Sequence, residues 1–378
     1  GEGAIRPPFF PFVWSLFMRM HFSELAIRFV LEFLPSVLTV FFVYLVGKEV
    51  FGKRAGVIAA FMFSVLWIHL FYTIRFLTNI PALAFLFLSI YLFILSTKNK
   101  LNYKLLGTSL VLLSISTLFR YPNGLIFFVY FVMLIIGKQL NLNKLKFWMT
   151  GLIGLIPIWI FFIFNFITKG NIFPALLGKA YLKPDEAILR PLGFSFLNYI
   201  PIYLRNVFFV LFLIGLVIVL FELIIGYNFI PKNKKLQNYL HILLILIIIF
   251  SFFIFFLRII EDRWLFATAL PLVCIAALGI DKCYLFIKKY NKYLAVILLI
   301  GILIFGAYPQ IKTADDLITV KKGSYIQMRQ AFEWIKATTP EDTVIAGLGI
   351  EPYLVYYSGR QQLPISHDES DKEKSLAV

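Results

Sequence analysis

The sequence predicts an all-α polytopic membrane bundle of about ten spans, followed by a small C-terminal extracytoplasmic α/β segment. The first observation is composition: 60% of the 378 residues are hydrophobic and 15% are charged, whereas soluble domains average about 25% charged residues. The second is that the 36 Lys and Arg residues lie outside the long apolar stretches. A cation at the bilayer centre costs about 2.5 to 3.5 kcal/mol, which explains that exclusion. An ordinary soluble enzyme is therefore excluded.

A helix that crosses a bilayer needs about 20 predominantly apolar residues. Several of the apolar stretches are shorter than this, so we expect the connections beside them to dip below the lipid headgroups. In chain order, the predicted spans cover residues 29–46, 55–73, 80–96, 105–119, 123–137, 147–168, 206–226, 239–257, 264–280 and 293–309.

The third observation is the charge of the loops, which alternates along the chain. Five loops carry 16 Lys or Arg residues between them, against only Glu49 and Asp281, and the short loops of opposite parity carry few. The positive-inside rule makes the first set cytoplasmic, so that segment 169–205 and the tail from residue 310 lie outside. The net charge of +16 then reflects membrane topology, and we expect no nucleic-acid partner. The cytoplasmic loops are residues 47–54, 97–104, 138–146, 227–238 and 281–292.

Two parts are expected: a transmembrane domain over residues 1–309 and the start of a soluble domain over residues 310–378. In the second part, Met328 and Phe332 at helical spacing predict a helix that ends before Pro340, and the apolar run that follows predicts a strand. We expect this domain to be truncated. Because the first residues would lie outside with no span to deliver them, we also expect at least one helix upstream of Gly1.

Polar residues gather at the predicted outer ends of the spans. Arg75 and Arg120 each open a short outer connection, and Glu261, Asp262 and Arg263 share another. The planar guanidinium of arginine binds phosphate oxygens bidentately and stays charged, so these residues are candidates to bind a lipid phosphate. The competing interpretation is that each arginine anchors its span at the interface and that the two acids form a local ion-pair cluster. The four His residues are scattered and predict no metal site.

The order of short motifs adds a resemblance to a known family. The chain opens with Arg6-Pro-Pro-Phe-Phe-Pro11, Ala26-Ile-Arg28 precedes a span, and Gly47-Lys-Glu-Val-Phe-Gly52 follows it. Further motifs lie at residues 75–81, 117–122, 263–271 and 356–360. In this order they resemble the GT-C class of integral membrane glycosyltransferases, in particular the branch of protein O-mannosyltransferases and the lipid A aminoarabinose transferase.

The resemblance implies a hexosyl- or pentosyltransferase in a prokaryotic plasma membrane. Such enzymes take a sugar from a polyprenyl- or dolichyl-phosphate donor on the extracytoplasmic face and pass it to a protein, lipid or glycan acceptor. An acid in the first outer loop acts as base or helps to organise the site, and it is expected upstream of Gly1. Asn79 stands where many relatives have Asp, and an amide binds substrate but takes no proton. No cofactor is predicted, and a divalent cation is left open. The expected substrate-binding residues are Arg6, Arg28, Arg75, Asn79, Arg120 and Arg263, with Glu261 and Asp262 as weaker candidates.

Two alternatives remain. A secondary transporter has a similar number of spans but places ionisable groups near the bilayer midplane, whereas the acids within spans, Glu32 and Glu222, lie near span ends. A lipid-linked glycan ligase or polymerase uses similar donors and also has large outer loops. The proline-rich segment 169–205 cannot form one continuous helix, so short helices over the site are expected there.

Overall fold

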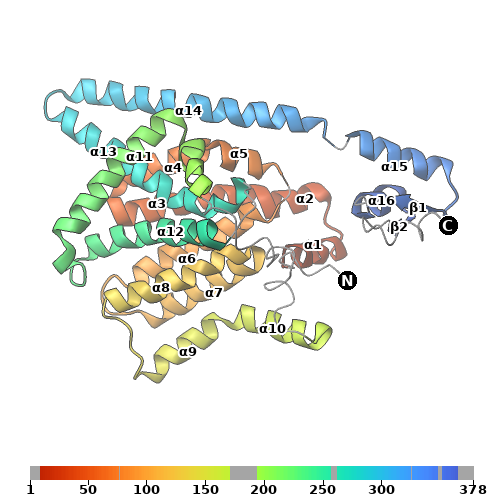
Figure 1. The fold of residues 1–378 in the computed structure, drawn as a ribbon, viewed down its shortest axis with the longest axis horizontal. Coiled ribbons are helices and arrows are strands. Elements are labelled where there is room, and N and C mark those ends of the chain that lie inside the picture. Colours follow the sequence, from red (N-terminus) through yellow and green to blue (C-terminus); the bar gives the residue numbers. More distant parts are fainter. Residues whose placement is uncertain are drawn as a thin grey trace. The chain divides into compact units, whose positions relative to one another are not determined.

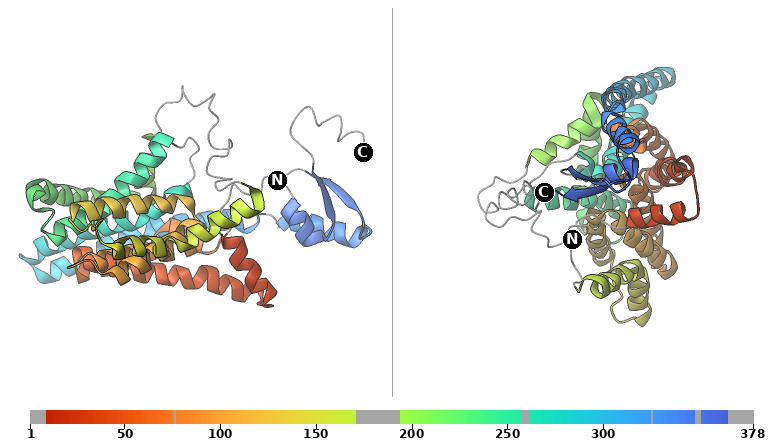
Figure 2. Two further views of the ribbon diagram at one scale, coloured as in Figure 1. Left: turned by 90° about the horizontal axis from the view of Figure 1, so that it is seen from below. Right: turned by 90° about the vertical axis from the view of Figure 1, so that its right-hand side faces the viewer.

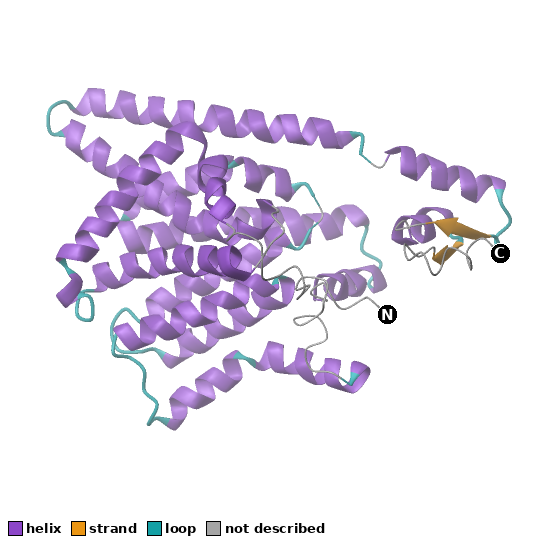
Figure 3. Cartoon of the chain, viewed as in Figure 1, coloured by secondary structure: helices purple, strands orange, loops and turns teal. Residues whose placement is uncertain are grey.

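The computed structural model describes residues 9–75, 77–170, 194–256, 262–324, 326–347 and 351–364. Arg6 and Glu261, and most of segment 169–205, lie outside the described residues. The chain divides into two compact units, Gly1–Ala314 and Asp315–Val378. Helices dominate both, and strands are confined to the second unit among the described residues (Figure 3).

The first unit is a bundle of helices (Figures 1 and 2). Within it, α6 packs against both α3 and α7, and α13 packs against both α11 and α4. The helices and helical turns are α1 (Phe9–Arg19), α2 (Glu24–Arg28), η1 (Phe29–Phe33), α3 (Leu34–Phe51), α4 (Lys53–Val65), α5 (Trp67–Thr73), α6 (Asn79–Ser96), α7 (Tyr103–Phe119), η2 (Tyr121–Gly124), α8 (Leu125–Ile136), α9 (Leu145–Gly154), α10 (Ile156–Lys169), η4 (Phe194–Asn198), α11 (Tyr199–Ile225), η5 (Tyr227–Phe229), α12 (Lys234–Phe256), η6 (Asp262–Thr268), α13 (Ala269–Lys288) and α14 (Lys292–Lys322).

Six helices of the described residues are long and apolar enough to cross a membrane, or up to eight if two bent pairs each count as one span. A helical membrane bundle is thus confirmed, and the count of about ten stays a prediction. The predicted spans 105–119 and 123–137 form shorter helices. The first, α7, has 17 residues and extends about 26 Å, short of a hydrocarbon core of about 30 Å.

The predicted span 55–73 is broken rather than continuous. Leu66 adopts extended backbone (φ −60°, ψ 124°), and α4 and α5 meet at an angle of 54°. The break frees backbone groups, and the Trp67 N–H is satisfied by Oε1 of Gln310 at 3.0 Å. In lipid such a group must find a protein partner, since no water is present to bind it.

Helix α11 is also interrupted, at Arg205 (φ 54°, ψ 178°). Nε2 of Gln310 donates to the carbonyl of Tyr203 at 2.9 Å, and Nε1 of Trp67 donates to the carbonyl of Ile202 at 2.9 Å. The fully buried Gln310 therefore joins two irregular helices from a third one, α14.

Close helix contact depends on glycine where α11 meets α13. A Cβ on Gly215 would lie 1.9 Å from the carbonyl oxygen of Ile275, and one on Gly279 would lie 2.1 Å from that of Leu211. Only residues without a side chain allow backbones to approach this closely, as is common between membrane helices. The pair fixes how α13 lies against α11, and α13 follows directly from the polar turn η6.

The second unit contains α15 (Ile326–Thr338), β1 (Val344–Gly347), α16 (Glu351–Ser358) and β2 (Gln361–Pro364). The two strands pair in parallel, with Val344 opposite Gln361. Arg360 is buried, and its Nη2 donates to the carbonyls of Lys336 at 3.0 Å and Thr339 at 2.6 Å. A cation at carbonyls of a helix C-terminus is stabilised by the helix dipole, so Arg360 holds β2 against the end of α15.

Candidate functional site

Arg120 lies at the end of α7, where three distant segments of the chain meet. Its Nη1 donates to Oδ1 of Asn79 at 2.7 Å and to the backbone carbonyl of Arg263 at 2.7 Å. These partners are 41 and 143 positions away in the sequence. One guanidinium therefore links the start of α6, the end of α7 and the turn η6.

The local sequence positions Arg120. Its backbone is extended (φ −149°, ψ 110°) and caps α7, and Pro122 lacks the N–H that would continue the helix. Ser116, one turn earlier, donates from its hydroxyl to the carbonyl of Ala82 at 2.7 Å and accepts from Nδ2 of Asn123 at 2.8 Å. The end of α7 is thereby tied to the first turn of α6.

An apolar cluster supports this end of α6 and α7. Phe10 of α1 packs with Leu31, Ala82 and Phe119, and all four are buried. The Phe9 ring also meets the Phe119 ring edge-on, with centroids 4.9 Å apart. Since Phe119 precedes Arg120 and Ala82 lies one turn after Asn79, α1 helps to fix both polar residues.

Asn79 is the first residue of α6 and is only 3% exposed. Its Oδ1 binds Arg120, while its Nδ2 has no hydrogen-bond partner among the described atoms. Because an amide is neutral, it orients the guanidinium without cancelling its positive charge, which a carboxylate at this position would do. The contact thus leaves a buried donor of Asn79 beside a cation.

Asp262 begins η6 and acts as a hydrogen-bond acceptor there. Its Oδ1 accepts the hydroxyl of Tyr72 at 2.7 Å and the backbone N–H of Arg263 at 2.7 Å. Tyr203 donates its hydroxyl to the Asp262 carbonyl. These bonds hold the backbone of Asp262 and Arg263 in the position where the Arg263 carbonyl reaches Arg120.

Arg75 and Arg28 are the other two described arginines with predicted site roles. The Arg75 guanidinium lies 5.0 Å from the Phe71 ring centroid, and the charges of Arg75 and Arg263 both act on the Tyr72 hydroxyl. Arg28 is partly exposed and forms an i, i+4 ion pair with Glu24 at 3.0 Å. The structure therefore brings Asn79, Arg120, Asp262 and Arg263 together, with Arg75 adjacent through Tyr72. Arg6 and Glu261 lie outside the described residues.

Glu32 is a further candidate residue of this site, and the sequence did not single it out. It lies in η1, a π-helical turn, and is 4% exposed, and its Oε1 has no partner among the described atoms. The Leu77 backbone and the charge of Arg28 both act electrostatically on its carboxylate. Since Leu77 is two residues from Asn79, Glu32 lies beside the same connection. Two signals point to it: an acid within an apolar span and, in the structure, a π-turn, which is common at functional sites.

Tyr72, Tyr203 and Gln310 were also missed. The chain has 19 Tyr residues, and nothing in the local sequence distinguishes these two from aromatic residues that only pack. Gln310 lies just beyond the last predicted span, in the segment assigned to the outer tail. Among the described residues no group of three or more His, Cys, Asp or Glu side chains could hold a metal ion.

Chemically, the arginines at this end of the bundle suit a neutral or anionic ligand. Arg120 is oriented by neutral acceptors at two points, and Arg75 and Arg263 lie near the same Tyr72. Such an arrangement suits phosphate oxygens, because guanidinium groups form charge-assisted hydrogen bonds with them. Unpartnered polar atoms of Asn79 and Glu32 supply one donor and one acceptor for hydroxyl groups.

Comparison with known proteins relates the chain to a family and to solved structures. The family model for dolichyl-phosphate-mannose-protein mannosyltransferase matches residues 5–164, which include Asn79 and Arg120. No curated protein matches the chain by sequence.

Two solved membrane enzymes share the fold. The Archaeoglobus fulgidus oligosaccharyltransferase, tethered with an acceptor peptide containing the NVT sequon, superposes with a TM-score of 0.64 at 16% identity, over 95% of this chain and 55% of that chain. ArnT from Cupriavidus metallidurans, bound to undecaprenyl phosphate, superposes with a TM-score of 0.63 at 12% identity, over 99% of this chain and 78% of that chain. The chain thus spans little more than half of the first protein.

These matches confirm the resemblance predicted from the sequence. The chain has the GT-C membrane fold, and over residues 5–164 it is similar to the dolichyl-phosphate-mannose-protein mannosyltransferases.

Proposed function

We propose that this protein is a multi-pass membrane glycosyltransferase with about ten spans. It moves a sugar from a polyprenyl- or dolichyl-phosphate donor to a protein, lipid or glycan acceptor on the extracytoplasmic face. The observation that carries the proposal is Arg120, held at the end of α7 by Asn79 and by the Arg263 carbonyl. The family match over residues 5–164 and the undecaprenyl phosphate bound to ArnT support it.

Arg120 binds the donor phosphate in this proposal. When the bond from the sugar to the phosphate breaks, negative charge grows on the departing lipid phosphate. A cation fixed in place before the reaction stabilises that charge without reorganisation, which is often the largest contribution to catalysis. Arg75 and Arg263 add to the positive potential at the same end, and the lipid chain extends along the apolar surface of the spans.

Asn79 and Glu32 bind hydroxyl groups of the reacting sugar or of the acceptor. Each has a buried polar atom with no partner among the described atoms, and leaving such an atom unpaired costs about 1 to 3 kcal/mol. A bound hydroxyl recovers that cost and orients the sugar relative to the phosphate. Removal of the acceptor proton falls to the acid that the family resemblance places in the first outer loop.

The test is sugar transfer in membranes that contain the full-length protein. A panel of polyprenyl-phosphate monosaccharides with radiolabelled sugars serves as donor. Arg120→Gln is expected to lower kcat/KM about 100-fold or more, the effect of removing one preorganised donor from a charge-stabilising site. Arg329→Gln, in an exposed i, i+4 ion pair of α15, is the matched control and is expected to leave transfer unchanged. Folded, inserted protein that transfers no sugar from any donor would overturn the proposal.

The likeness to the oligosaccharyltransferase supports a second candidate, transfer of a preassembled glycan. The two candidate functions, transfer of a single sugar and transfer of a preassembled glycan, differ in the donor that the enzyme uses. A protein that ignores every lipid-linked monosaccharide but transfers a lipid-linked oligosaccharide is a ligase of glycan chains, whereas the reverse selectivity identifies a monosaccharide transferase.

A further inference from the structure

A cationic pocket lies at the opposite end of the bundle from Arg120. Helix α6 begins at Asn79 and has 18 residues, so it extends about 27 Å, and Lys98 follows just beyond its far end. There a pocket of about 280 Å³ opens between the ends of α3 and α6 and the start of α12. We call it the lysine pocket, and its lining residues are Glu49, Val50, Ile94, Lys98, Lys234, Lys235 and Asn238.

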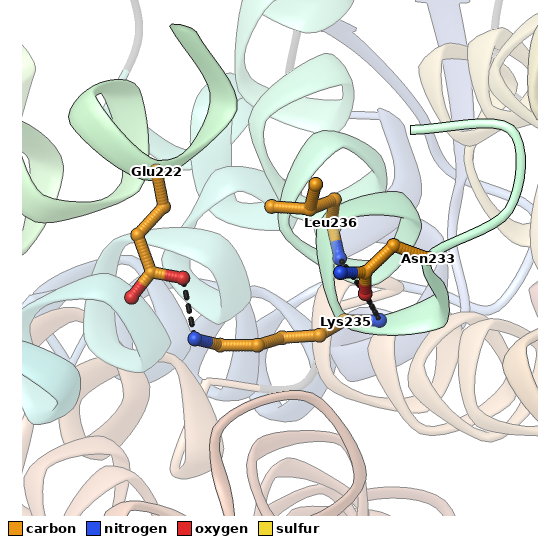
Figure 4. Close-up of polar contacts among 4 residues, drawn as sticks. All are labelled: Glu222, Asn233, Lys235 and Leu236. Atoms are coloured by element: carbon orange, nitrogen blue, oxygen red, sulfur yellow. Dashed lines mark hydrogen bonds and ion pairs between the residues drawn. The ribbon is translucent and has the colours of Figure 1, made fainter. Parts of the chain in front are cut away.

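Two of its three lysines are paired with carboxylates. Lys98 Nζ lies 2.5 Å from Glu49 Oε1, and this hydrogen bond raises the pKa of Lys98 above its usual value. Lys235 pairs with Glu222 of α11, as Figure 4 shows. These two cations are therefore locally neutralised.

Lys234 differs from the other two. Its described contact is with a neutral acceptor, Oε1 of Gln237 at 2.8 Å, and its side chain is partly buried. Counting the two acids, the three lysines leave a net charge of +1 at this pocket. A partly buried cation without a counter-ion is unfavourable, and an anion that enters the pocket compensates it.

The start of α12 does not itself supply the binding groups. Oδ1 of Asn233 accepts the backbone N–H groups of Lys235 at 3.0 Å and Leu236 at 3.3 Å (Figure 4). The helix is thus already capped by its own sequence. The excess charge belongs to the Lys234 side chain.

We propose that the lysine pocket binds one phosphate group with a single negative charge, of the diester type found in an anionic phospholipid headgroup. The net charge of +1 matches one phosphodiester. Val50 and Ile94 give the pocket apolar walls beside its cations, which suits a lipid with a charged head and apolar tails. Basic pockets between membrane helices are known to bind such headgroups. This site is independent of the sugar-transfer site, so either proposal stands if the other fails.

Native mass spectrometry of the full chain in detergent tests the proposal, with phosphatidylglycerol and phosphatidylcholine titrated separately. The wild type is expected to bind phosphatidylglycerol more tightly than the zwitterionic lipid. Lys234→Gln is expected to weaken phosphatidylglycerol binding about five-fold, the effect of about 1 kcal/mol per lysine near a lipid phosphate. The matched control is Lys232→Gln, two residues away and exposed, which is expected to leave the affinity unchanged.

Inorganic phosphate added as competitor distinguishes the two sources of this chemistry. If millimolar phosphate displaces the lipid, the pocket's ligand is a free phosphate anion. If the lipid stays bound, the ligand is the lipid headgroup. If Lys234→Gln does not fold, Asn238→Lys adds a cation to the lining and is expected to tighten phosphatidylglycerol binding about five-fold. Equal phosphatidylglycerol affinities in the wild type and in the folded variant tested would overturn the proposal.

Discussion

Gln310 accepts the backbone N–H of Trp67 at 3.0 Å, although the two residues are 243 positions apart. The same carboxamide donates to the Tyr203 carbonyl at 2.9 Å. Both partners lie where a helix is irregular, at Leu66 and near Arg205. One side chain therefore satisfies the backbone groups of two breaks.

Replacing Gln310 with Leu is expected to destabilise the protein. The change leaves a buried donor and a buried acceptor unpaired, each at a cost of about 1 to 3 kcal/mol. Thermal unfolding in detergent is expected to show a clearly lower midpoint. Gln330→Leu, at an exposed position of α15, serves as control. Equal midpoints for the Gln310 variant and the wild type would show that the breaks are satisfied in another way.

Asn79→Leu is expected to reduce sugar transfer while the protein stays folded. The variant removes an acceptor that orients Arg120, and a hydrogen bond to a charged group is worth about 1.5 to 3 kcal/mol. We expect kcat/KM for the donor to fall at least ten-fold. Asn143→Leu, at an exposed position of the connection between α8 and α9, is expected to have no effect. Full activity of the Asn79 variant would contradict the role given to the Asn79–Arg120 pair.

Glu32→Gln is expected to lower sugar transfer without lowering the stability of the protein. The amide keeps the shape of the side chain and removes a carboxylate whose burial is costly, so stability is expected to stay the same or rise. Transfer is expected to fall about ten-fold, because the amide presents a donor or a weaker acceptor where the carboxylate accepted. Kinetics and thermal unfolding are measured on the same preparation.

Glu222 provides the matched control for Glu32, since it is the other acid placed within a predicted span. It pairs with Lys235, at the end of the bundle away from Arg120. Glu222→Gln is expected to lower stability slightly and to leave transfer intact. If both variants lost activity equally, Glu32 would have no specific part in the site.

The contact between α11 and α13 is expected to have no room for a side chain in place of the glycine at position 279. Gly279→Val would drive a Cβ toward the Leu211 carbonyl, 2.1 Å away, and overpacking of this kind costs about 1 to 3 kcal/mol or more. Size-exclusion chromatography is expected to show aggregated or poorly folded protein. Gly301→Val has nothing within 4 Å of its Cβ and is expected to behave as wild type. Normal folding of the Gly279 variant would mean that the two helices separate easily.

The sequence allowed the membrane bundle and several residues of the site to be predicted, because the cost of charge in lipid leaves a visible pattern. Arg120 and Arg263 were selected as polar residues at the outer ends of apolar runs and Asn79 through the family resemblance, and the three residues do meet. Their pairing was not predictable, since it joins positions 41 and 143 residues apart.

The break at Leu66 and the role of Glu32 were missed for a different reason. Residues 55–73 contain neither Pro nor an internal Gly beyond Gly56, so nothing local marks an interruption. The break depends on Gln310, which binds the freed N–H from another helix. Glu32 was noticed only as an acid near a span end, because its proximity to the Leu77 backbone arises from tertiary packing.

The Gln310 contacts also make α14 part of the framework that holds Arg120. A chain of hydrogen bonds and covalent bonds connects Gln310 to the Arg120 guanidinium within the first unit. The covalent links are the side chain of Tyr203 and the peptide bond between Asp262 and Arg263. Helix α14 continues to Lys322, past Ala314, the last residue of the first unit. The helix by which the chain leaves the bundle therefore helps to position the arginine site, in addition to connecting the two units. In order, this path passes through Gln310, Tyr203, Asp262, Arg263 and Arg120.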